Sequence, residues 1–286
     1  MIPNEPHTSS ERRVVGGIPV DSVPQEKLLR RRFARTEADP PALVMTPNLA
    51  MAADLLRHPE NRTLFSDADV LLPDGCGIRL LGRLTGIALP TANGIDFAER
   101  LLEEAARRRE PVYFLGGKPR VAYDAAANKG AELTGLQVAG CHHGYFDKTP
   151  GCKENENVIR EINASGARLV FVCFGYPLQE TWMAQNRARL PGVRLCIGLG
   201  GSFDVWSGDL PRAPKLFRAA RLEWLWRTVH EPRRVRGVAG MLAALPHLWW
   251  ISLRQNGIVR SSERQNARKL QKIEAKSMQS DNLVKK

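Results

Sequence analysis

The sequence predicts an α/β fold, a mostly parallel Rossmann-like sheet with helices on both faces, followed by a basic C-terminal helical appendage. Two observations support this. Short apolar runs alternate with helical stretches from residue 41 onward, which is typical of strands buried between two helix layers. Charge is also unevenly distributed along the chain. Residues 206–286 contain 17 Lys and Arg against 6 Asp and Glu, so they carry +11 of the chain's net charge of +12. With 286 residues, 43% of them hydrophobic, the chain can bury a large core.

The apolar runs are short and rich in β-branched and aromatic residues, as buried strands are. They cover residues 42–45, 70–72, 112–115, 136–139, 169–174 and 194–197. Helical patterns over residues 96–108, 121–133 and 180–190 lie between them. Residues 14–32, before the first run, predict a short strand or hairpin followed by a basic helix. The alternation indicates parallel strands joined by crossover helices.

Composition divides the chain into four parts. We expect a disordered leader over 1–12, an α/β core over 13–205, an Arg/Trp-rich appendage over 206–260 and a flexible basic tail over 261–286. The polar N-terminus has no apolar segment typical of a secretory signal. The longest apolar stretch, 240–253, is too short to cross a bilayer and contains Pro246, so it could only lie on a membrane.

Cysteine and acidic residues predict no metal centre. The five cysteines form no CxxC pair, and we expect reduced thiols in a cytoplasmic protein. The six histidines show no ligand spacing. Asp67 and Asp69 have the DxD spacing of many metal-binding sugar-nucleotide enzymes, but they precede a strand and so lie away from the expected site. A helix end and turn is the simpler interpretation.

Polar and glycine-rich segments follow the predicted strands directly. They comprise Thr46-Pro-Asn48, Pro73-Asp74-Gly75, Gly116-Gly117, the segment from Gly175 through Gln179 to Glu180, and Gly198 to Asp204. Ligands of open α/β sheets bind outside the carboxyl ends of the strands. These segments therefore predict a single site along one edge of the sheet.

Local chemistry leaves alternatives open at the strand ends. Asp74, between proline and glycine, could be an exposed general base or simply part of a favourable turn. Thr46 and Asn48 could bind a sugar or phosphate, or Asn48 could cap a helix over 49–57. Gly116-Gly117 resembles a phosphate-binding turn before a helix, although the full dinucleotide and P-loop motifs are missing.

The last third combines arginine with tryptophan. Arginines 212, 227, 233, 234 and 236 outnumber Glu223 and Glu231, the acids among them, so they suit a diphosphate or else form a solvated basic face. Trp249 and Trp250, beside the short apolar segment, fit a helix lying on anionic lipid.

Taken together, these motifs resemble the bacterial WecG/TagA/CpsF glycosyltransferases over residues 14–240. The resemblance rests on the segments above and on Phe114-Leu-Gly-Gly117, Gly144-Tyr-Phe146, Gly200-Gly-Ser-Phe-Asp204, Arg212-Ala-Pro214, Leu222-Glu-Trp-Leu-Trp-Arg227 and Glu231-Pro-Arg-Arg234.

The resemblance implies an inverting transferase that moves a hexose from a UDP-sugar to a polyprenyl-diphosphate-linked sugar during cell-surface polysaccharide synthesis, without a metal. It implies Asp74 as the base with Thr46 beside it. The implied substrate-binding residues are Asn48, Gly75, Gly116, Gly117, Gln179, Glu180, Asp204, Arg212, Arg227, Arg233, Arg234 and Arg236. In the family the appendage is linked to peripheral docking on the inner face of the cell membrane and to a change of oligomeric state.

The sequence differs from the usual family pattern at two places, and both differences affect charge. Relatives usually have Lys where this chain has Leu178, and often an arginine shortly before the Gly94-Ile-Asp96 element, where this chain has Pro90 to Asn93. Both remove positive charge, so a neutral donor sugar, N-acetylmannosamine or glucose, is favoured over an acidic one.

Two rival functions remain at this level. The pI near 9.9 and the arginine-rich tail are compatible with nucleic-acid binding, which explains little of the acids and glycines in the neutral body. A nucleotide-sugar-processing enzyme such as an epimerase is disfavoured because no dinucleotide fingerprint follows the first strand.

Overall fold

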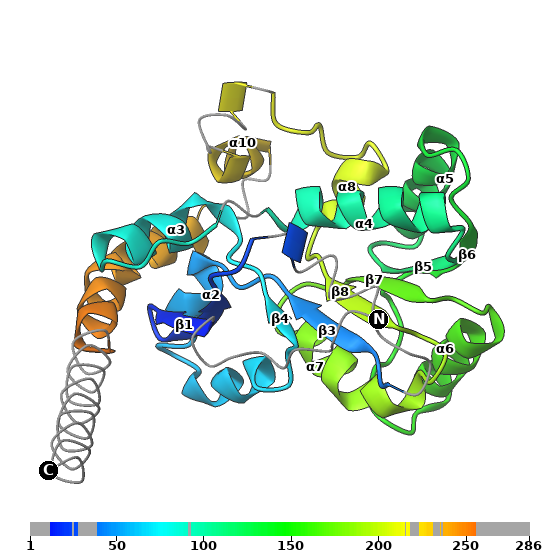
Figure 1. Cartoon of the computed structure of the whole chain (residues 1–286), viewed down its shortest axis with the longest axis horizontal. Coiled ribbons are helices and arrows are strands. Elements are labelled where there is room, and N and C mark those ends of the chain that lie inside the picture. The colour runs from blue at the N-terminus through cyan, green and yellow to red at the C-terminus, as the bar shows by residue number, and fades with distance from the viewer. Residues whose placement is uncertain are drawn as a thin grey trace, which may run out of the picture.

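The protein contains a six-stranded parallel sheet between two helix layers, as the sequence predicts (Figure 1). The computed structural model describes residues 12–24, 26–27, 39–90, 93–214, 216–217, 223–230, 235 and 237–255, without the side chains of Glu223 and Arg227. Residues 1–11 of the predicted leader, the predicted basic helix beyond residue 27 and the tail after residue 255 lie outside these ranges. The last residue of the predicted leader, Arg12, belongs instead to a strand.

The sheet consists of β3 (Ala42–Met45), β4 (Val70–Leu71), β5 (Val112–Gly116), β6 (Val138–His142), β7 (Leu169–Cys173) and β8 (Leu195–Gly198), in the order β4-β3-β8-β7-β5-β6. All neighbouring pairs are parallel. A separate antiparallel hairpin, β1 (Arg12–Val15) with β2 (Ile18–Asp21), confirms the hairpin predicted near the N-terminus.

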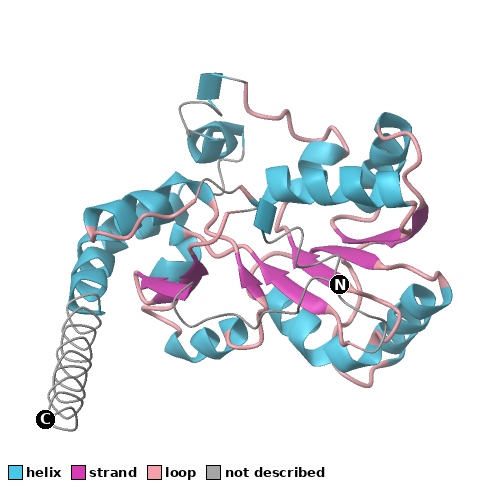
Figure 2. Ribbon diagram, in the orientation of Figure 1, coloured by secondary structure: helices cyan, strands magenta, loops and turns pink. Residues whose placement is uncertain are grey.

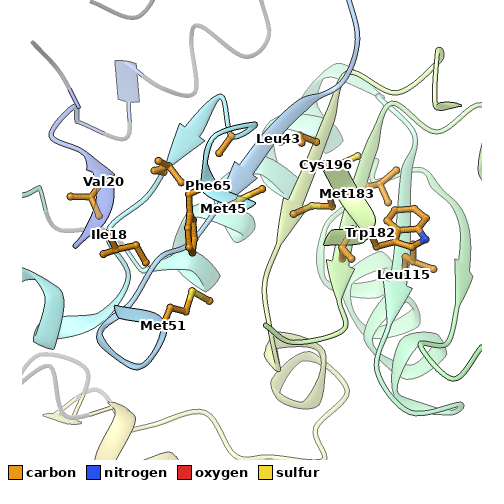
Figure 3. Packing of buried hydrophobic residues seen from close by; sticks show 14 of the residues in the cluster. Ile18, Val20, Leu43, Met45, Met51, Phe65, Leu115, Trp182, Met183 and Cys196 are labelled. Atoms are coloured by element: carbon orange, nitrogen blue, oxygen red, sulfur yellow. The ribbon is translucent and has the colours of Figure 1, made fainter. Parts of the chain in front are cut away.

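Alternate side chains of each strand enter opposite cores. Leu43, Met45 and Cys196 pack on one face, with α2 (Leu49–Asp54), α6 (Lys153–Ala164) and α7 (Leu178–Asn186). Figure 3 shows this core, which also takes in Ile18 and Val20 of the hairpin and Phe65 of η1 (Pro59–Phe65).

The other face is covered by α4 (Gly94–Arg108), α5 (Val121–Glu132) and α8 (Ser202–Trp206). Figure 2 shows these helices and those of the first layer on opposite sides of the strands. Phe114, Phe171, Phe203 and Trp206 form an aromatic cluster between this layer and the sheet. Burial of every position in the central strands explains why their sequences are continuous apolar runs.

One strand differs from its prediction. The apolar run at 136–139 predicted a strand there, and β6 instead covers Val138–His142. As an edge strand, β6 pairs only with β5, which aligns Val112 with Val138 and Leu115 with His142 around a register irregularity. Half-exposed edge positions accept Gly140, Cys141 and His142, so pairing with β5 rather than local hydrophobicity sets the bounds.

The C-terminal part continues through α10 (Glu223–His230) to a helix over residues 237–255. This last helix lies beside α3 (Gly75–Leu84) and β1 (Figure 1). Ser252 Oγ accepts a hydrogen bond from Gly16 N at 2.6 Å, and Leu248 is fully buried. Among the described helices, none is both long and apolar enough to span a bilayer.

Candidate active site

Parallel pairing brings the carboxyl ends of all six strands to one edge of the sheet, so the segments that follow them lie together as predicted. Several glycines there leave the backbone uncovered. Gly75, Gly175 and Gly200 follow β4, β7 and β8 with positive φ, and among the described residues a Cβ on any of them would meet no atom within 4 Å beyond its chain neighbours. This edge therefore presents accessible main chain to a ligand.

Asp74 is the acid at this edge. It precedes α3 in extended conformation, and Oδ1 accepts a hydrogen bond from the backbone N–H of Gly94 at 2.8 Å. Gly94 is the first residue of α4, where the helix dipole also stabilises negative charge. Asp74 is thus more than a turn residue, because its half-buried carboxyl group links the ends of β4 and α4.

Thr46 lies next to the same contact. Its hydroxyl donates to the carbonyl oxygen of Gly198 at 3.1 Å, and the residue is 5% exposed. A Cβ on Gly94 would lie 2.9 Å from Thr46 Cγ2, so Gly94 packs directly against the threonine. The family resemblance paired Asp74 with Thr46 and named Gly94 only as part of the Gly94-Ile-Asp96 element; the structure shows that Gly94 contacts both residues.

Asn48 caps a helix, one of the two alternatives left open by the sequence. Its Oδ1 accepts a hydrogen bond from Met51 N at 3.1 Å, at the start of α2. The capped helix ends at Asp54, three residues before the predicted end. The cap accounts for this asparagine at the carboxyl end of β3.

The Gly116-Gly117 turn holds three strand ends together. Gly116 has a φ of 130°, and its Cβ would lie 2.4 Å from the carbonyl oxygen of Cys173. Gly117 donates its N–H to that oxygen at 2.9 Å and accepts from Gly144 N at 2.8 Å. Close backbone packing thus requires glycine here; phosphate binding stays a prediction.

Lys148 is a cation at this edge that the sequence analysis did not single out. Its ammonium group donates to the carbonyl oxygens of Gly144 and Phe146 and lies 4.5 Å from the ring centroids of Phe146 and Phe174. Burial lowers the pKa of the amine below its ordinary value. The available signal was a lysine two residues after Gly144-Tyr-Phe146.

Gln179 and Glu180 are both fully buried, at the start of α7. Gln179 Nε2 donates to Glu180 Oε1, and Gln179 Oε1 accepts from Gly200 N in the turn after β8. Asp204, in the first turn of α8, is half-buried, and its carbonyl oxygen accepts from Leu210 N.

Arg212 contacts acids that are distant in sequence. Its two terminal nitrogens donate to both carboxylate oxygens of Glu99, at 2.7 and 2.8 Å, and to Oδ1 of Asp96 at 2.5 Å. The sequence analysis considered only Glu223 and Glu231 as acidic partners of the arginines. For Arg212 this was wrong, because its partners Asp96 and Glu99 lie on α4. The contact anchors the segment before α10, where Trp226 donates to Pro211 O.

Arg212→Ala is expected to lower the free energy of unfolding by about 1 to 3 kcal/mol, because it removes the shortest hydrogen bonds to the carboxylates of Glu99 and Asp96. Burial alone would raise the pKa of Glu99, but Arg212, together with Lys129 and Trp206, outweighs it and the pKa lies below its ordinary value. The folded state then binds fewer protons, so this stabilisation is present above about pH 4.5 and is lost as the pH falls through the folded pKa.

Urea titrations of the wild type and Arg212→Ala at pH 7.5 and at acidic pH would measure this difference. Arg120→Ala is the matched control, since it removes an exposed arginine that pairs with Asp124, and its effect should be close to zero. Equal stability of Arg212→Ala and the wild type at pH 7.5 would contradict the anchoring role.

The remaining arginines of the predicted diphosphate clamp, Arg233, Arg234 and Arg236, lie outside the described residues, as does the side chain of Arg227.

At the opposite edge of the sheet, Asp69 Oδ2 accepts hydrogen bonds from Leu43 N at 2.9 Å and from Arg187 at 2.8 Å. These contacts support the structural interpretation of Asp67-Ala-Asp69. In the part of the chain that the structure describes, His, Cys, Asp and Glu form no cluster of three or more suited to a metal.

Comparison with known proteins assigns the family. The profile of the Glycosyl transferase WecG/TagA/CpsF family matches residues 13–262. The chain belongs to this family. It is also similar to an N-acetylglucosaminyldiphosphoundecaprenol N-acetyl-beta-D-mannosaminyltransferase from Bacillus spizizenii, with 33% identity over 196 residues that cover 68% of this chain and 74% of the relative. The family profile covers the whole sheet and the edge that carries Asp74 and Thr46.

Proposed function

We propose that this family member is a hexosyltransferase that moves N-acetylmannosamine or glucose from a UDP-sugar to a polyprenyl-diphosphate-linked sugar, with inversion at the anomeric carbon and without a metal. The observation that carries the proposal is the Asp74–Gly94–Thr46 arrangement at the open edge of the sheet. The relative from Bacillus spizizenii, named as a mannosaminyltransferase on a lipid-linked sugar, supports the class of substrates.

The proposed reaction is a single displacement. An acceptor hydroxyl attacks the anomeric carbon, Asp74 takes the hydroxyl proton, and the bond from that carbon to the UDP oxygen breaks. Gly94 N–H holds one carboxylate oxygen of Asp74 in place. Attack from the face opposite UDP inverts the anomeric centre. Basic residues of the appendage would stabilise the charge that develops on the leaving diphosphate.

A lipid-linked acceptor requires access to a membrane, and we propose that the protein docks peripherally on its inner face. Exposed apolar residues lie on α3, which begins directly after Asp74, and on the adjacent C-terminal helix: Leu80, Leu84, Trp249, Trp250 and Leu253. Arg254 stacks over Trp250 at 3.8 Å. Arginine beside interfacial tryptophan suits an anionic lipid surface.

The test is release of UDP from a panel of UDP-sugars, with a synthetic lipid-diphosphate sugar acceptor and excess EDTA. Acceptor-dependent release from a single donor is expected. Release only after addition of a divalent cation would overturn the metal-independent part. No release from any donor, with tight binding of DNA or RNA instead, would overturn the proposal, and bound nicotinamide would favour an epimerase-like enzyme.

A further inference from the structure

Gln179 and Glu180 form a buried polar pair beneath the turn that follows β8. Both side chains are 0% exposed. Gln179 Nε2 donates to Glu180 Oε1 at 2.9 Å, and Gln179 Oε1 accepts from the backbone N–H of Gly200 at 2.9 Å. The glutamate therefore fixes which way the amide faces, and the amide holds the glycine turn.

The pair is connected to the candidate base by direct contacts. A Cβ on Gly198 would lie 2.8 Å from Gln179 Nε2, so the strand end packs directly on the amide. The carbonyl oxygen of Gly198 accepts from Thr46, Thr46 packs on Gly94, and Gly94 donates to Asp74. A displacement of Gln179 would thus reach the residues around the base without any contact between Glu180 and substrate.

Glu180 itself is fully buried. Within the described residues, its Oε2 is inaccessible and has no hydrogen-bond partner, and no ion pair with Lys or Arg includes it. Burial raises the pKa of this carboxyl above its ordinary value. A group with these properties is suited to holding a neighbour in position, and its burial keeps it from the substrate.

We propose that Glu180 is a positioning residue of the transferase, a buried acid that orients Gln179 so that the amide supports the Gly198–Gly201 turn and, through Gly198, the Thr46 side of the site. This inference rests on the proposed function. It replaces the substrate-binding roles that the family resemblance implied for Gln179 and Glu180 with a supporting role. The donor and acceptor then meet the glycine turn, while the two polar side chains beneath it stay covered.

The experiment is a double-mutant cycle on kcat with the full-length protein. Glu180→Met and Gln179→Met should each lower kcat roughly tenfold to hundredfold with KM for both substrates within about twofold, because small displacements near reacting groups reduce rates strongly. Since Glu180 acts through Gln179, the double variant should lose no more than the worse single variant. Losses that multiply in the double variant would overturn the proposal.

Conservative variants separate position from charge. Glu180→Gln keeps an acceptor oxygen at the same reach and should recover most of the kcat that Glu180→Met loses. Glu180→Asp keeps the carboxyl but withdraws it by one methylene group, so it should lose activity as Glu180→Met does. The opposite order, an active Asp variant and an inactive Gln variant, would mean that the ionisable proton acts directly and would overturn the positioning role.

Glu110→Gln is the matched control. Glu110 is largely buried, bonds Arg194 at 3.0 Å and has one unpartnered buried oxygen, but it lies before β5 at the opposite edge of the sheet. The kcat of the Glu110→Gln variant should equal that of the wild type. A loss in this control comparable with that of Glu180→Met would show that burial of any glutamate explains the result.

Hydrogen exchange gives a readout that does not depend on turnover. The Gly200 amide is bonded to Gln179, so a peptide covering residues 198–204 should exchange faster in Glu180→Asp and Gln179→Met than in wild type or Glu180→Gln. Unchanged exchange in Gln179→Met would overturn the proposed support of the turn. If the wild type transfers no sugar, the proposed function fails, while this exchange measurement still decides the positioning.

Discussion

Asp74→Asn is expected to abolish sugar transfer while UDP binding stays close to that of wild type. The amide cannot take the acceptor proton, and loss of a general base typically lowers rates by about 10² to 10⁴. The asparagine oxygen can still accept from Gly94 N–H, so the geometry between α3 and α4 should be preserved. Steady-state UDP release and calorimetric titration with UDP would measure the two effects separately.

Asp124→Asn is a matched control for this prediction. Like Asp74, Asp124 lies near the start of a helix, in the first turn of α5, but its carboxylate pairs with Arg120 on the surface. Transfer by this variant should equal that of wild type. Transfer by Asp74→Asn within about threefold of wild type would remove Asp74 from the role of base and direct attention to the other polar groups at the edge.

Gly116→Ala is expected to prevent the protein from reaching its normal stability. The φ of 130° is unfavourable for any residue with a side chain, and the new Cβ would lie 2.4 Å from the carbonyl oxygen of Cys173. Backbone strain and overpacking each cost about 1 to 3 kcal/mol, so a loss of roughly 2 to 6 kcal/mol is expected. That is a large share of the stability of a typical domain.

Chemical denaturation of purified protein would measure this loss, with soluble yield as the readout if the variant does not fold. Gly130→Ala is the control, because Gly130 lies inside α5 and its Cβ would meet only Val138 Cγ2 at 3.6 Å. Alanine should stabilise that helix slightly. A Gly116→Ala protein as stable as the wild type would show that the turn can move away from β7.

Much of the architecture was predictable because its signals are local. Continuous apolar runs located β3 and β7 to within one residue, since strands buried on both faces must be apolar at every position. Capping by Asn48 was one of two alternatives that the sequence left open, and the structure shows the cap at the start of α2. The polar segments after the strands predicted which edge of the sheet carries the site.

Other features depended on partners that are remote in sequence. The place of β8 between β3 and β7 follows from long-range pairing, which no local pattern specifies. Arg212 hydrogen-bonds to Glu99, which is 113 residues away in the sequence. The composition of the appendage could not predict this carboxylate partner. The same is true of Gly94, whose N–H is an ordinary helix start until the fold places it against Asp74.

The sequence by itself thus determined the class of fold, the family, the edge of the sheet and the identity of the candidate base, because each depends on residue type and order along the chain. The tertiary structure decided what each polar group touches: Gly94 on Asp74, Gly198 on Thr46, and Gln179 with Glu180 beneath the glycine turn. A hydrogen bond requires two groups within about 3 Å. Only folding brings groups separated by tens of residues to that distance.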